Sequence, residues 1–132
     1  MLQIPVTNNP KTEFFTQVYD TRTSDNANAV NLQLTTYFNT MSSMWYLDLK
    51  DSLGNPYALG LAMVPNIDIT RSVTILPNDF GQFRIFDTTG DGNATLTSLG
   101  NSSYLVYFAN GEFEDLYTNS PSVTKIAPIG GM

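Results

Sequence analysis

Apolar and polar residues alternate with a period of two along much of this 132-residue chain. Successive side chains of a β-strand point to opposite faces, so the alternation is typical of strands with one buried face. Together with β-branched and aromatic runs, it predicts strands over residues 2–6, 14–19, 30–38, 44–50 and 83–87. Pro5 lacks a backbone N–H, so the first strand is expected at a sheet edge or in an arm.

Residues 44–50 form the clearest of these predicted strands. Trp45, Leu47 and Leu49 share one face, and polar or amphipathic residues share the other. We therefore expect Trp45 in the core, with its indole N–H bonded to a local acceptor. The alternative is a sugar-stacking platform on the surface.

A turn over residues 51–56 contains Gly54 and predicts that the chain reverses there into a β-hairpin. Residues 57–64 are apolar at both odd-numbered and even-numbered positions, that is, on both faces of a strand. This second strand is therefore expected at the centre of a sheet or covered on both faces. Residues 104–109 show the same pattern.

The remaining segments complete the predicted topology. Residues 67–76 are interpreted as a strand pair or one bent strand, and residues 94–99 as a single helical turn that ends at Gly100. No long segment has helical periodicity. The sequence thus predicts an all-β, single-domain barrel or sandwich of about seven to eight short antiparallel strands over residues 1–118. An extended tail containing Pro and Gly follows over residues 119–132.

Composition and charge narrow the function classes. Charged residues make up 14% of the chain and the net charge is −6. The six basic residues are scattered, which argues against nucleic-acid binding through the phosphate backbone. No apolar run reaches the length of a membrane span, and the N-terminus does not resemble a secretory signal. We therefore expect a protein that is made in the cytoplasm and binds neither membrane nor specific DNA sequences.

Candidate catalytic and metal-binding groups are few. The absence of His and Cys excludes the Ser-His-Asp and Cys-His schemes and any thiolate metal site. Asp87 and Asp91 have the spacing of two calcium ligands, but Ser98 stands where a calcium loop needs its last Glu. A plain turn explains them equally well, and we predict no cofactor.

The acidic residues Glu112, Glu114 and Asp115 form the densest carboxylate group in the chain. Two carboxylates across a cleft can hydrolyse glycosides, which makes a carboxylate hydrolase one hypothesis. Carboxylates directly after a strand are more often a solvated edge that discourages strand pairing, and we favour that interpretation.

The sequence of residues 44–64, MWYLDLKDSLGNPYALGLAMV, resembles the baseplate plug proteins of a cyanophage with a simple contractile tail. The family pattern is a strand ending W-x-L-D-L, an acidic turn with G-x-P, and an apolar strand with a central Gly. The residues that match it are Trp45, Leu47, Asp48, Leu49, Asp51, Gly54, Pro56 and Gly60. Residues 81–87, a segment ending Leu99-Gly100 and the strand 104–108 also look similar, so the resemblance covers roughly residues 30–110. The loop at 25–29 and the tail after residue 118 depart from it.

The resemblance implies a β-barrel-like structural protein without catalytic residues, in the tail baseplate of a virion. It implies a position near the hub and the start of the tail tube. The partners would be the hub, the tail-tube initiator and copies of the chain in a three- or six-fold ring. The acidic charge suits a conduit through which DNA passes.

An assembly function directs attention to the chain ends and the tyrosines. Exposed tyrosines bury much area at low entropic cost in interfaces, although they also pack along sheets as cross-strand pairs. The candidate interface residues are Leu2, Ile4, Tyr37, Tyr46, Tyr117, Ile126 and Ile129. A second hypothesis is a carbohydrate- or receptor-binding β-sandwich of a phage tail, in which Trp45 contacts the ligand.

Overall fold

The computed structural model describes residues 1–22, 29–77, 79–88 and 94–117. These residues form seven strands and one short helix. In chain order they are β1 (Leu2–Ile4), β2 (Lys11–Val18), β3 (Val30–Asn39), β4 (Met44–Asp51), β5 (Pro56–Ala62), β6 (Gln82–Asp87), β7 (Ser103–Phe108) and α1 (Glu112–Tyr117).

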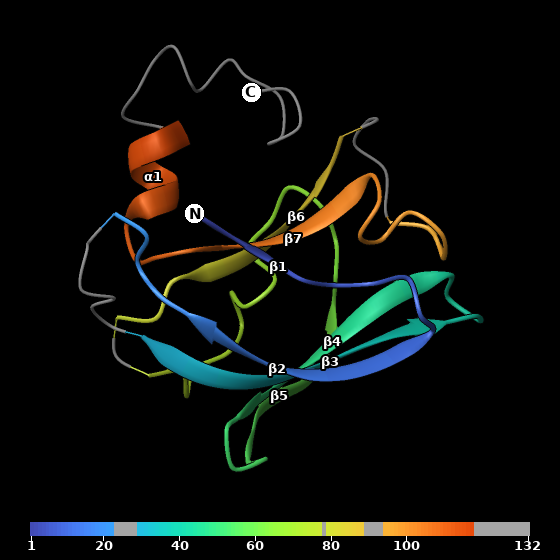
Figure 1. Ribbon diagram of the computed structural model, residues 1–132, viewed down its shortest axis with the longest axis horizontal. Coiled ribbons are helices and arrows are strands. Elements are labelled where there is room, and N and C mark those ends of the chain that lie inside the picture. Colours follow the sequence, from blue (N-terminus) through green and yellow to red (C-terminus); the bar gives the residue numbers. More distant parts are fainter. Residues whose placement is uncertain (23–28, 78, 89–93, 118–132) are drawn as a thin grey trace.

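The strands form two antiparallel sheets stacked as layers (Figure 1). One sheet has three strands in the order β1-β7-β6, and the other has four in the order β2-β3-β4-β5. The prediction of a small all-β fold is confirmed, and of its two forms the structure is the open, two-sheet one, since the sheets do not close into a barrel. β1 lies at a sheet edge, as Pro5 predicts.

The main core lies between the two sheets. β4 contributes Trp45, Leu47 and Leu49, all at most 1% exposed, and β7 contributes Leu105 and Tyr107 from the opposite layer. The predicted burial of Trp45 is confirmed, and its indole N–H donates to the backbone C=O of Thr95 at 2.8 Å.

A second, smaller apolar cluster covers the other face of the three-stranded sheet. Phe108 of β7 packs there against Phe113 of α1, with ring centroids 5.2 Å apart, and the Arg84 guanidinium lies 3.7 Å from the centre of the Phe113 ring. β7 is therefore covered on both faces, which explains why residues 104–109 carry apolar side chains at both odd-numbered and even-numbered positions. The sequence analysis did not predict α1.

The prediction for residues 57–64 was wrong, because β5 is an edge strand. Its register against β4 shifts twice, between Leu47 and Leu49 and between Leu49 and Lys50. Each extra residue reverses the parity of the side chains, so apolar residues fall on both faces without both faces being covered. Leu59 is consequently 61% exposed.

Two further local predictions were wrong. Residues 67–76 contain no strand, although Ile69 is buried and donates its N–H to the C=O of Phe83 at 3.0 Å. Residues 94–99 form turns instead of a helix, with the Ser98 N–H bonded to the Thr95 C=O at 3.2 Å. In the described part of the chain, no helix is long and apolar enough to cross a membrane.

Candidate functional site

The outward face of the four-stranded sheet carries a pair of stacked tyrosines. β3 and β4 place Tyr37 directly opposite Tyr46, and their rings stack at 5.8 Å with an interplanar angle of 22°. The Tyr37 hydroxyl donates to Asp48 Oδ1 at 3.3 Å, and the Gly60 N–H donates to the same oxygen at 2.8 Å. Burial, and then the Asp48 carboxylate, raise the pKa of the Tyr37 hydroxyl. These bonds hold Tyr37 in a fixed orientation on the open face.

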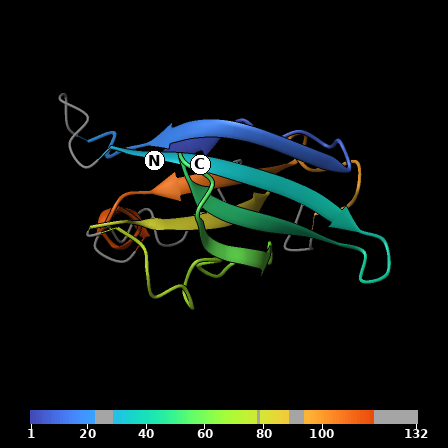
Figure 2. The same ribbon diagram turned by 90° about the horizontal axis from the view of Figure 1, so that it is seen from below.

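Phe15 adds a large exposed apolar side chain to the same face. It lies in the middle of β2 and is 68% exposed. Its cross-strand neighbour is Gln33, whose own neighbour on β4 is Lys50, so the register gives it no apolar partner in that row. An exposed aromatic residue and a fixed aromatic pair on the same sheet face are features of protein interfaces. Figure 2 shows this sheet with β2 along one edge and β5 along the other.

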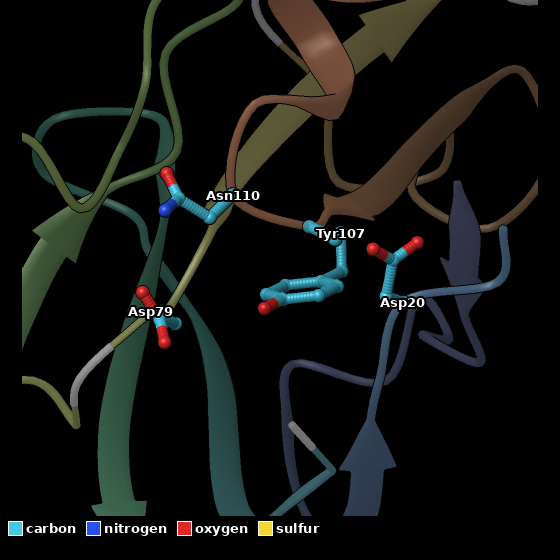
Figure 3. Close-up of a pocket in the computed structure, with 5 residues that line it drawn as sticks. Asp20, Asp79, Tyr107 and Asn110 are labelled. Atoms are coloured by element: carbon cyan, nitrogen blue, oxygen red, sulfur yellow. The ribbon is translucent and has the colours of Figure 1, made fainter. Parts of the chain in front are cut away.

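A polar pocket of about 260 Å³ lies at the other end of the molecule, lined by Asp20, Asp79, Tyr107, Ala109 and Asn110. Figure 3 shows the Tyr107 ring between the two carboxylates. The Tyr107 hydroxyl accepts a hydrogen bond from the Gly81 N–H at 2.9 Å, and burial raises the pKa of that hydroxyl.

The two pocket carboxylates differ in their surroundings. Arg22 donates to both oxygens of Asp20 at 2.9 Å and lowers the pKa of that carboxyl, whereas Asp79 is exposed. Asp20 is thus a neutralised ion-pair member and a poor general acid. Among the described residues, no group of three or more acidic side chains could hold a metal ion. Asp87 ends β6, and Asp91 lies outside the described residues.

The acidic group at residues 112–115 holds the chain together locally. Glu112 is only 3% exposed, so the prediction of a solvated edge was wrong for it. It accepts hydrogen bonds from the Ala109 N–H at 3.0 Å and from the Thr21 hydroxyl at 3.5 Å, and it pairs with the Met1 amine. Asp115 accepts from Arg22 at 2.9 Å. The two carboxylates therefore make separate contacts and do not face each other across a cleft.

The other predicted interface residues have different surroundings. Leu2 is half-buried at the edge of the three-stranded sheet, and Ile4 is 1% exposed within the core, so its side chain contributes to folding. Tyr117 ends α1. Ile126 and Ile129 lie outside the described residues. The sequence analysis missed Phe15, although its position between Glu13 and Gln17 on the polar parity could have identified it.

Comparison with known proteins gives one family. The model of the family described as "Cyanophage baseplate Pam3 plug gp18" matches residues 1–111, which is most of the chain and all seven strands. No curated protein matches. The matched part contains the stacked tyrosines and Phe15, whereas α1 and the residues after it lie beyond the match.

Proposed function

Because this chain belongs to the cyanophage baseplate plug family, we propose that it is the plug at the junction of the hub and the tail tube. The family is a structural one, and its place is the virion, in the tail baseplate. On this proposal the chain works by protein–protein contact and catalyses no reaction. Its partners are the hub, the tail-tube initiator and further copies of the chain in a three- or six-fold ring.

The observation that carries the proposal is the open face of the four-stranded sheet. Tyr37 and Tyr46 are stacked and held by hydrogen bonds before any partner arrives, so their ordering costs little on binding. Phe15 supplies an apolar side chain that the described residues leave 68% exposed and that a partner would bury. A surface that presents fixed tyrosines and an exposed phenylalanine suits a permanent interface better than free solvent.

The net charge of −6 supports a position beside the DNA path. A negative surface repels phosphates and keeps the passing genome from binding. The proposal therefore includes no sequence-specific contact with nucleic acid and no membrane contact.

The test is virion assembly from phage whose own copy of this gene is replaced by variants. Phe15→Ser and Tyr46→Ala should each lower the number of complete tails while the purified proteins remain folded. Asn31→Ser, an exposed position on the same face, is the matched control and should assemble normally. Normal tails from a Phe15→Ser, Tyr46→Ala double variant would overturn the role of this face.

The tail over residues 119–132 takes part in the proposal as a segment that binds neighbouring subunits. Deleting residues 120–132 should impair assembly and leave the β domain folded. Complete virions assembled without these residues would contradict the proposed role of the tail. The proposed role of the open face would still stand.

A further inference from the structure

The exposed backbone edge of β2 is the feature from which this inference starts. The Phe38 N–H donates to the Pro10 C=O at 2.9 Å. This bond identifies which alternate residues of β2 form hydrogen bonds with β3. In an antiparallel pair, alternate residues point their backbone groups toward the partner strand. Lys11, Glu13, Phe15 and Gln17 therefore direct their N–H and C=O groups away from β3.

This edge is regular and open in the described part of the chain. β2 pairs with β3 over eight consecutive residues without a bulge, and no other described strand pairs with it. Thr12, Phe14 and Thr16 on the inner parity are only half-buried. An edge of this length without a proline or a bulge is a template for strand addition.

The other edges are less suited to accept a strand. β5 carries two register shifts, and β1 has only three residues followed by Pro5. Ile69 already donates its N–H to the outer side of β6 at Phe83. Contacts in a cyclic ring are heterologous, so an edge there meets a different element of the next copy. The occupant of the β2 edge must then come from outside the two sheets.

Residues 122–127 have the sequence Ser-Val-Thr-Lys-Ile-Ala, which is rich in β-branched residues and bounded by Pro121 and Pro128. The tail carries a single charged side chain, that of Lys125, whereas all twelve acidic residues precede it. The tail side chains are thus basic while the chain as a whole is acidic, and β2 presents an exposed carboxylate at Glu13.

We propose that residues 122–127 of a neighbouring copy add to β2 as an antiparallel strand. The proposal rests on the proposed function, which supplies the ring of copies. One register satisfies both charge and shape: Lys125 lies opposite Glu13, and Val123 opposite Phe15. An opposite-charge pair and an aromatic–β-branched pair are the cross-strand contacts that stabilise sheets. In the same register Ile126 covers the half-buried Thr12 on the inner side.

The absence of native cysteine makes disulfide trapping a direct test. Full-length Glu13→Cys and Lys125→Cys chains are purified separately, mixed and oxidised, so that a bond between them can form only between two molecules. Cα atoms of paired antiparallel residues lie about 5.5 Å apart, within disulfide range. We expect a several-fold excess of this heterodimer over that formed by a Leu53→Cys and Lys125→Cys mixture. Leu53 is 86% exposed in the β4–β5 turn and serves as the matched control.

Two results would overturn the inference. Equal yields from the two mixtures would mean that β2 is not the site of the tail. A Glu13→Cys, Lys125→Cys double variant that closes mainly within one molecule on dilution would mean that the tail covers its own edge. Either result, together with assembly defects in Phe15→Ser phage, would leave the baseplate function standing, whereas normal Phe15→Ser and Tyr46→Ala tails would count against the function itself.

Discussion

The three-stranded and four-stranded sheets differ in how many of their faces are covered. β7 lies between the opposing sheet and α1, and five of its six residues are buried. β4 has the opposing sheet on one side only, and its residues alternate between buried and half-buried. The first sheet thus uses both faces for folding, whereas the second has one face that the described residues leave partly exposed. The distinction predicts where substitutions harm folding and where they harm assembly.

The largest expected effect comes from the same residue type on the two sheets. Phe108→Ala empties a site between β7 and α1 that is 0% exposed, and should lower the free energy of unfolding by about 3–5 kcal/mol. Phe15→Ala on the open face should change it by less than about 0.5 kcal/mol. Urea denaturation of both variants measures the contrast, and equal losses would break the comparison.

Substitutions of Glu112 test whether its contacts hold α1 against the three-stranded sheet. Glu112→Ala removes the acceptor of the Ala109 N–H and should cost about 1–3 kcal/mol of unfolding free energy. Glu112→Gln keeps an acceptor oxygen and should cost less. Glu114→Ala is the control, because Glu114 lies on the same helix but is exposed. Thermal or urea unfolding that does not separate Glu112→Ala from Glu114→Ala would mean that the buried carboxylate contributes nothing.

Tyr46 tests the open face itself. Tyr46→Ala removes the ring stacked on Tyr37 and should lower the unfolding free energy by about 0.5–1.5 kcal/mol, the value of an aromatic pair. Tyr46→Phe loses only the hydroxyl bond to Ser42 and should be nearly neutral. A loss as large as that of Phe108→Ala would show that this face contributes as much to folding as the covered faces of the other sheet.

The smallest effect concerns the Arg22–Asp20 pair and depends on pH. Arg22 lowers the pKa of Asp20 in the folded state. The stabilisation is therefore present above the unfolded pKa, about 3.9, and is lost as the pH falls through the lower folded pKa. Because Arg22 is partly exposed, Arg22→Gln should cost less than about 1 kcal/mol at pH 7. The cost should shrink below pH 4 in urea titrations, and a cost that is the same at both pH values would exclude this ion pair as its source.

The sequence predicted those parts of the fold in which the alternation of apolar and polar residues matches the alternation of buried and exposed side chains. Trp45, Leu47 and Leu49 alternate and are buried, and the hairpin through Gly54 is where the turn residues place it. β5 was misjudged because two bulges reverse its parity, and a bulge leaves no mark in the order of apolar residues. α1 is too short for a helical period to appear, and its first residue, Glu112, is anchored by partners distant in sequence such as Thr21.

The candidate site was predicted in part for the same reason. Tyr37 and Tyr46 were identified individually, but their stacking depends on the register between β3 and β4. That register brings together residues from two strands and is set by the turn between them. Ile4 was predicted in an interface because it sits near the chain end, yet the pairing of β1 with β7 draws it into the core. Position along the chain is a poor guide to exposure when a terminal strand joins a sheet.

Because of the two register shifts in β5, the two edges of the four-stranded sheet differ in regularity. Its β2 side is straight and can be extended, while its β5 side is twisted out of line by the extra residues. Two copies could pair through their β2 edges, but growth beyond such a pair by edge addition would require the β5 side to act as a regular strand. The irregular β5 side therefore works against open-ended fibre growth through this sheet.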